Sequence, residues 1–347
     1  MKLRFLAFGL LFCLRLSGGS LLNAFGQQSV PDAPNAPMSA SVSELEDAHK
    51  LIQQGMTDEA ITKLQALDPS TKGVALELGN AYYKKSDFSQ AIQYLKKANA
   101  EDPANQEATQ LLGMAYFAGG HPGDAIPLLE KVQGSMPHAN ADGYYILGTC
   151  YIQIRNYDGA RNSFAKMFNV PTESGAAYLF AARMLLRQEF DPVAEQYAQK
   201  AVALDPKLPL AHYLLGELDL YKARLPEAIA EFQKELEINP AHAATYYKLG
   251  DAYSRVQKYD EAQTMLQRSI RLDSTSSVPF ILMGQVLQKR GDYDLAVLSL
   301  KHAVTMEPNN PTAHYLLGQT YREMGRKEDA TEELKRAQEL HGTEDLQ

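Results

Sequence analysis

The 347-residue sequence predicts an all-α solenoid, which is a stack of consecutive helical hairpins. Two ladders of residues support this prediction, because both recur with a period near 34. The first ladder consists of glycines, with Ala182 in the one gap: Gly79, Gly113, Gly148, Gly216, Gly250, Gly284 and Gly318. The second consists of prolines: Pro69, Pro103, Pro137, Pro171, Pro206, Pro240 and Pro308. Two independent ladders with one period indicate one repeated structural unit.

Each unit is expected to hold two helices. Around Gly250, the residues Tyr246, Leu249 and Tyr253 recur at i, i+3 and i+7, which places them on one stripe of a helix. An alanine always stands twelve residues after the ladder position, and a bulky residue usually follows four later, as Ala262 and Leu266 do here. Glycine on the first helix and alanine on the second let the two backbones approach closely. One hairpin cannot bury its own apolar face, so neighbouring hairpins must complete the core.

Two segments resemble tetratricopeptide repeats: VALELGNAYYKKSDFSQAIQYLKKANAEDP (residues 74–103) and AATYYKLGDAYSRVQKYDEAQTMLQRSIRLD (residues 243–273). The resemblance divides residues 74–341 into eight units, at about 74–106, 107–140, 141–173, 174–207, 208–241, 242–275, 276–309 and 310–341. Residues 42–72 resemble a shortened ninth unit, and residues 342–347 form a tail. The resemblance implies a right-handed superhelix with a concave groove that binds partners.

The N-terminal residues have the layout of a secretory signal peptide, with a basic start, the apolar run Phe5–Leu14 and small residues at Ala24 and Gly26. We expect cleavage after Gly26, and an uncleaved membrane anchor is the alternative. Residues 27–41 contain three prolines and read as a flexible linker. The protein is therefore expected to be exported, to the periplasm or outside the cell.

Charge and composition exclude several classes of function. The formal net charge is −8, and loss of residues 1–26 would remove three basic residues and no acid. An acidic chain of this kind is a poor match for nucleic acid. The two cysteines, Cys13 and Cys150, are far apart in the sequence, no histidine pair at i, i+4 or phosphate-binding loop is present, and Cys150 reads as a small buried side chain. We expect no cofactor, no metal, no small-molecule substrate and no enzymatic activity.

The candidate binding residues lie on the other stripe of the first helices, which lines the concave groove in the family that the chain resembles. The stripe is rich in apolar and aromatic residues: Tyr83, Phe117, Tyr145, Ile152, Leu186, Tyr213, Leu220, Tyr247 and Tyr315. Four residues after the ladder position, the side chains change from apolar in the first five units to Ser254, Gln288 and Arg322 in the last three. The alternative is that the tyrosines pack on neighbouring helices.

Basic residues gather on the same side, including Arg183, Arg187 and Arg255. Arg183 and Arg187 stand one helical turn apart and could hold one carboxylate together. The predicted partner is therefore a protein or peptide with an acidic residue or a free C-terminus. Scattered solvated charges are the alternative reading.

The predicted function is a non-catalytic protein–protein interaction scaffold of the cell envelope. The alternative is a component of a polysaccharide or pilus secretion complex, in which the groove tyrosines contact glycan or a machine subunit. At the C-terminal end, the polar segment KEDATEELKRAQEL could cap the solenoid. Otherwise Leu334 and Leu340 would form the contact of an end-to-end homodimer.

Overall fold

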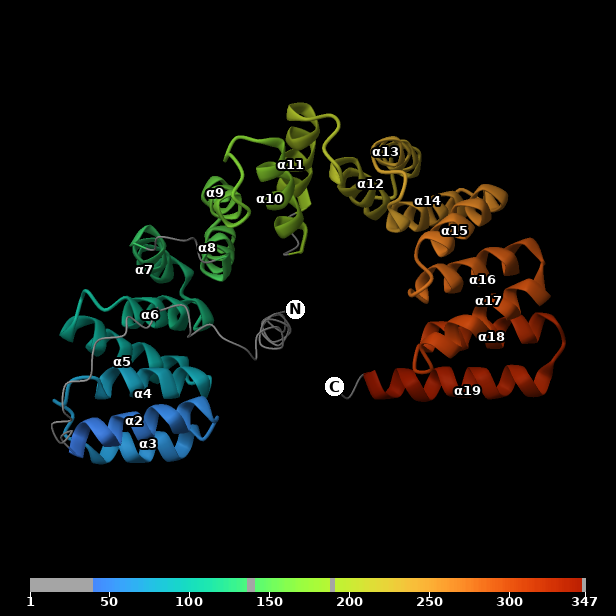
Figure 1. Cartoon of the computed structure of the whole chain (residues 1–347). Coiled ribbons are helices and arrows are strands. Elements are labelled where there is room, and N and C mark those ends of the chain that lie inside the picture. Colours follow the sequence, from blue (N-terminus) through green and yellow to red (C-terminus); the bar gives the residue numbers. More distant parts are fainter. Residues whose placement is uncertain (1–39, 136–140, 188–190, 345–347) are drawn as a thin grey trace, which may run out of the picture.

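The computed structural model describes residues 40–135, 141–187 and 191–344, and these form eighteen helices and no strand. The helices are α2 (Ala40–Gln53), α3 (Thr57–Ala66), α4 (Val74–Lys84), α5 (Phe88–Glu101), α6 (Gln106–Ala118), α7 (Pro122–Ser135), α8 (Ala141–Gln153), α9 (Tyr157–Met167), α10 (Gly175–Arg187), α11 (Asp191–Leu204), α12 (Ala211–Tyr221), α13 (Leu225–Ile238), α14 (Ala243–Arg255), α15 (Tyr259–Leu272), α16 (Val278–Arg290), α17 (Tyr293–Met306), α18 (Pro311–Glu323) and α19 (Lys327–Glu344). Consecutive helices pair into nine hairpins, which follow one another along an arch (Figure 1). The predicted all-α stack of hairpins is confirmed.

The first helix of each hairpin lies on the inner side of the arch. Each first helix contacts the second helix of its own hairpin and the second helix of the hairpin before it. Most first helices also touch the first helix of the next hairpin, whereas second helices do not contact one another in this way. In a curved stack, successive elements lie closest together on the inner side. The even-numbered helices therefore line the concave face. This contact is slightest at α10, toward both α8 and α12. The inner surface is therefore most open around α10.

Two predicted boundaries differ from the helices observed. Helix α2 begins at Ala40, inside the predicted linker 27–41, and α19 continues to Glu344, inside the predicted tail. The predicted signal peptide, its cleavage site and residues 27–39 lie outside the described residues. Helices α2 and α3 occupy the shortened unit, where α3 has only 10 residues.

The glycine ladder marks the contact between the two helices of each hairpin. A Cβ atom added to Gly216 would lie 2.6 Å from Cε1 of Phe232, and one added to Gly148 would lie 2.6 Å from Cε1 of Phe164. At Gly284 the same atom would lie 2.4 Å from Cγ of Leu300. Real Cβ atoms do not approach other carbons so closely. The glycines are therefore required because the bulky residue of the second helix occupies the space that a side chain would need.

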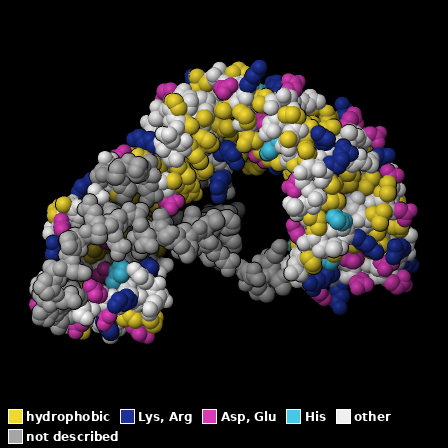
Figure 2. Space-filling view, viewed as in Figure 1, with side chains coloured by type: hydrophobic (Ala, Val, Ile, Leu, Met, Phe, Trp, Pro, Cys, Tyr) yellow, Lys and Arg dark blue, Asp and Glu magenta, His cyan; other side chains and the backbone are white. Residues whose placement is uncertain are grey.

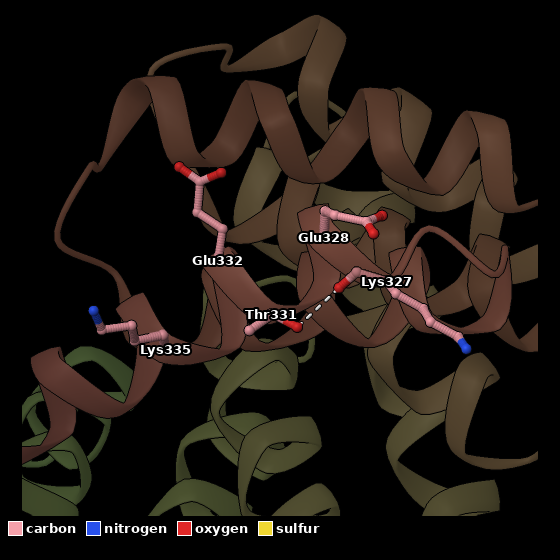
Figure 3. A pocket seen from close by; sticks show the side chains of 5 residues that line it. All are labelled: Lys327, Glu328, Thr331, Glu332 and Lys335. Carbon is pink, nitrogen blue, oxygen red and sulfur yellow. Dashed lines mark hydrogen bonds between the residues drawn. The ribbon is translucent and has the colours of Figure 1, made fainter.

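The C-terminal helix presents a polar face at the end of the stack. Five exposed side chains of α19 line a shallow depression there: Lys327, Glu328, Thr331, Glu332 and Lys335 (Figure 3). Leu334 instead points toward α18, because a Cβ atom on Gly318 would lie 2.8 Å from its Cγ. Leu334 therefore belongs to the contact between α18 and α19, while the exposed side chains of α19 are polar.

Candidate functional site

A cleft of about 430 Å³ opens on the inner face between α10, α12 and α14. Eight residues line it: Leu186, Glu217, Leu220, Tyr221, Tyr247, Lys248, Asp251 and Arg255. Figure 2 shows hydrophobic side chains gathered along the inner edge of the arch near its top, around α10 and α12. The cleft lies where the first helices contact each other least, which gives it a structural cause.

The apolar part of the cleft has a buried base and an exposed rim. Leu220 is only 6% exposed and packs in one cluster with Phe232 and Leu249, so the core of the hairpin holds it in place. Leu186 and Tyr247 are half-buried. Tyr221, in contrast, is 74% exposed, which is more than any other large apolar side chain of the described residues. Its ring offers apolar area and a hydroxyl to anything that enters the cleft.

The charged residues that line the cleft are all paired. Lys248 Nζ lies 3.0 Å from Glu217 Oε1, which also accepts a hydrogen bond of 3.0 Å from the Tyr213 hydroxyl. Arg255 donates to both oxygens of Asp251, at 3.1 and 2.9 Å. Because each pair is neutral, the lining itself has no charge left to satisfy.

Arg183 and Arg187 lie beside the cleft on α10 and are exposed. In the described part of the chain neither arginine has an ion pair or a hydrogen-bonded partner. Burial, and after it the Glu217 carboxylate, raises the pKa of the Tyr213 hydroxyl, and the charge of Arg183 partly offsets this. Arg183 is therefore close enough to the tyrosine to act on it electrostatically, while its own charge stays uncompensated.

Four of the twelve predicted groove residues line the cleft: Leu186, Leu220, Tyr247 and Arg255. Three more stand on the same helices without lining it: Arg183 and Arg187 on α10, and Tyr213 on α12, whose hydroxyl donates to Glu217. The other five do not belong to it. Ile152 is completely buried against Phe164 and Leu185, so the prediction that it lines the groove is wrong. The reason is that the side chains of Phe164 on α9 and Leu185 on α10 pack over it, although the backbones of α8 and α10 come close at few points.

The remaining four predicted residues lie elsewhere on the first helices. Tyr83, Phe117 and Tyr145 are half-buried and pack against buried core clusters. Tyr315 on α18 is 47% exposed and accepts a hydrogen bond of 2.6 Å from Gln319 Nε2.

Sequence reasoning missed four residues that line the cleft: Glu217, Tyr221, Lys248 and Asp251. A signal for three of them was present. Glu217 and Asp251 stand one residue after the ladder glycine, and Lys248 stands two before it. Opposite charges at these positions of successive units could have indicated cross-hairpin pairing.

Two features of the described side chains concern metal binding and cysteine reactivity. These side chains contain no group of three or more His, Cys, Asp or Glu residues that could hold a metal ion. Cys150 is buried, and burial raises the pKa of its thiol to about 12, which keeps it protonated. None of the helices described is both long and apolar enough to span a bilayer.

Two buried histidines have structural roles. His212 and His314 stand four residues before a ladder glycine, where Tyr246 stands in another unit, and both are buried. The Nδ1 atoms also lie 2.5 Å from Glu231 and 2.6 Å from Glu333, and the Nε2 atoms lie near the carbonyl oxygens of Pro206 and Pro308. Each histidine thus ties a first helix to its partner helix and to the preceding turn.

Family models described as tetratricopeptide repeats match residues 82–133 and 287–346, and a further such model matches residues 231–264. The matched segments come from the beginning, the middle and the end of the hairpin stack. The matched segments are tetratricopeptide repeats, and the stack of hairpins continues between them. Such repeat proteins are typically non-catalytic scaffolds that bind protein or peptide partners.

Several solved structures are similar to the chain over about half of its length. YrrB, titled a protein with an unusual peptide-binding site, is 25% identical, with a TM-score of 0.45 over 52% of this chain and 93% of that one. PilF of Pseudomonas aeruginosa is 19% identical, with a TM-score of 0.47 over 58% of this chain and 97% of that one. MamA is 21% identical, with a TM-score of 0.44 over 48% and 97%. No curated protein matches the sequence.

Proposed function

We propose that this protein is an exported, non-catalytic scaffold that binds a peptide segment of a partner on its inner face. The cleft between α10, α12 and α14 is the proposed contact point. The observation that carries the proposal is the exposed ring of Tyr221 at the edge of an apolar cleft whose own charges are paired.

The size and lining of the cleft suit one apolar side chain of an extended segment. Its volume of about 430 Å³ falls in the range of about 300–1,000 Å³ that binding pockets occupy. Leu186 and Leu220 offer an apolar base, while the Tyr221 and Tyr247 rings can cover a guest from the side. Aromatic residues around a desolvated pocket supply most of the affinity in many interfaces.

Removing the two tyrosines tests the cleft. We expect Tyr221→Ala/Tyr247→Ala to weaken binding of peptides selected by the wild-type protein at least tenfold, about 1.4 kcal/mol or more. The measurement selects peptides from a displayed random library and then titrates them against both proteins. The fold should survive because Tyr221 is exposed and Tyr247 is half-buried.

Tyr315→Ala is the matched control, since Tyr315 is an exposed tyrosine on another first helix, outside the cleft. It should bind the selected peptides as the wild type does. Unchanged affinity in the double variant, or an equal loss in the control, would contradict the cleft. A glycan array run in parallel tests the alternative, because sugar rings could also stack on Tyr221 and Tyr247.

Export has its own test. The basic start, the apolar run Phe5–Leu14 and the small residues Ala24 and Gly26 support a cleaved signal peptide. Mass spectrometry of the protein from fractionated cells should find the mature N-terminus at Gln27, in the periplasm or the medium. A cytosolic protein that retains the first 26 residues would contradict this prediction.

A further inference from the structure

We infer that the buried His212 and His314 act as two pH-sensitive switches, each of which holds a hairpin together while its ring carries a proton on both nitrogens. The first switch consists of His212, Glu231 and the carbonyl group of Pro206, and the second of His314, Glu333 and the carbonyl group of Pro308. They hold α12 to α13 and α18 to α19, and they need no peptide in the cleft. Because α12 also supplies residues that line the cleft, the first switch acts on one wall of the proposed binding site.

A histidine and a glutamate occur together at two matched positions of the repeat. Among the eight full units, the residue four before the ladder position is a histidine only at His212 and His314. The residue fifteen after the ladder position is a glutamate only in the same two units, at Glu231 and Glu333. The other six units have neither residue at these positions. Two separate units therefore combine the histidine and the glutamate as a pair.

Both nitrogens of each ring face acceptors. His212 Nδ1 lies 2.5 Å from Glu231 Oε2, and His212 Nε2 lies 3.2 Å from the carbonyl oxygen of Pro206. The corresponding distances for His314 are 2.6 Å to Glu333 Oε2 and 3.0 Å to the equivalent proline carbonyl. A carbonyl oxygen and a carboxylate only accept, and a neutral imidazole has one N–H to donate. Both contacts are hydrogen bonds only if each ring is an imidazolium with two N–H groups.

The proline carbonyl also receives a donor in a unit that has no histidine. Tyr246 stands at the histidine position of that unit, and its hydroxyl donates to the carbonyl oxygen of Pro240 at 3.2 Å. The glutamate position of the same unit holds the apolar Met265. A tyrosine thus makes the contact with the turn through one donor, whereas a histidine at this position also meets a second acceptor.

His49 is a contrasting case, in which a neutral ring satisfies both contacts. Its Nδ1 lies 3.0 Å from Glu77 Oε1, while its Nε2 lies 2.7 Å from the side-chain amide nitrogen of Gln53. An amide N–H can donate to Nε2, so one N–H on the ring is enough there. The need for a second ring proton therefore applies to the two switches and does not apply to every contact between histidine and glutamate.

Other charged groups lie on the elements that pack against the two rings. Glu231 also accepts from Lys234 at 2.7 Å, and Glu235 accepts from backbone N–H groups at the start of α12. Further contacts around the first ring are Glu195–Lys222, Asp219–Arg224, Glu217–Lys248, Asp205 with the Lys207 N–H and His242 with Thr245, and Arg183 acts on the neighbouring Tyr213. Those around the second ring are Glu307–Asn310, Asn309–Arg336, Arg290–Asp292 and Lys301 over the Tyr321 ring. These contacts involve none of the four ring nitrogens, which bond to the two glutamates and the two proline carbonyls.

Raising the pH should loosen both hairpins. Loss of either ring proton leaves a nitrogen lone pair facing an acceptor, in sites where His212 is 6% and His314 is 7% exposed. A folded pair that holds a proton more tightly than the unfolded chain does is stabilised at low pH and loses this contribution as the pH rises. Burial opposes the charge of Glu231, but the hydrogen bonds from His212 and Lys234 outweigh it and lower the pKa of its carboxyl, so this acceptor stays ionised in mild acid. The switches therefore hold from mildly acidic to neutral pH and release in alkali.

Hydrogen exchange of the full chain at about pH 6 and about pH 9 tests the switches, because a free imidazole loses its second proton at about pH 6.5. Each rate is divided by that of the unfolded chain at the same pH, so that only the change in protection remains. We expect the protection of α12 and α18 to fall at least tenfold more than that of α6, which has Thr109 at the histidine position. An equal change in α12, α18 and α6 would overturn the inference.

Two variants of the first switch separate the ring proton from the rest of the hairpin. Glu231→Gln places an amide N–H opposite Nδ1, as at the Nε2 atom of His49, so a neutral ring suffices and the pH dependence of α12 should disappear. His212→Tyr/Glu231→Met copies the arrangement of Tyr246 and Met265 and should have the same result. In both variants α18 should keep its pH dependence, which makes it the control within the same molecule.

The variants give distinct outcomes. Loss of the pH dependence of α12 in Glu231→Gln, with α18 unchanged, would confirm the first switch. A fall in α12 protection that persists in Glu231→Gln would overturn it, because other groups would then be responsible. If His212→Tyr/Glu231→Met leaves α12 unprotected at both pH values, Glu231→Gln alone decides between these two results. None of these outcomes depends on whether the cleft binds a peptide.

Discussion

Replacing Phe232 by alanine should destabilise the hairpin α12–α13 by about 3–5 kcal/mol, the usual cost of removing a buried aromatic ring. Phe232 is completely buried, and it shares a cluster with Leu220, Leu249 and Ala252. Gly216 has no side chain that could fill the cavity left behind. Because Leu220 rests on this cluster, the base of the cleft should loosen as well.

Hydrogen exchange of the α12 amides is the appropriate measurement. A stack of nine hairpins need not unfold in one step, so a single melting temperature would blur a local change. Leu298→Ala is the control, since Leu298 is 65% exposed and its removal should cost no more than about 0.5 kcal/mol. Equal protection of α12 in wild type and Phe232→Ala would show that the ring does not support the hairpin.

Replacing Glu235 by alanine should cost about 2–4 kcal/mol, because two backbone N–H groups would lose their carboxylate acceptor. Glu235 is completely buried in α13, and its carboxylate accepts from the Leu210 N–H at 2.9 and 3.0 Å and from the Tyr213 N–H at 3.3 Å. It thereby caps the start of α12, where the preceding residue supplies no side-chain cap. Leu210 has φ +69°, a left-handed conformation that a branched side chain adopts at a cost.

Urea unfolding of the full chain, combined with exchange of the Leu210 and Tyr213 amides, would measure this effect. Glu235→Gln should recover only part of the loss, because an amide keeps one acceptor oxygen and places N–H donors against the helix start. Glu237→Gln on the same helix is the control, since Glu237 is exposed and should change stability little. Rapid exchange confined to other helices would contradict the capping role.

Much of the hairpin geometry could be predicted from the ladders. The pairing of Gly216 with Phe232 and of Gly284 with Leu300 follows from their spacing of sixteen, and the structure places each pair in contact. Such local contacts repeat from unit to unit, so one pattern predicts all of them. The cap by Glu235 has no such pattern, because no other unit has a glutamate at this position. Nothing nearby in sequence indicates the acceptor that Leu210 needs.

The candidate site was predictable only in part. The inner stripe included Leu186, Leu220 and Tyr247, but it also included Ile152, which the structure buries. A stripe identifies one side of a helix, and it cannot tell how closely the next helix approaches that side. The opening depends on the slight contact of α10 with α8 and α12, which is a property of the assembled stack.

By itself, the sequence determined the helical hairpin, its period and the close contact inside each unit, because these depend on residues at most a few turns apart. Tertiary structure decided which inward residues remain accessible and which charges find partners. It paired Glu217 with Lys248 and left Arg183 and Arg187 without an acid, since those relations depend on how far one hairpin turns and separates from the next.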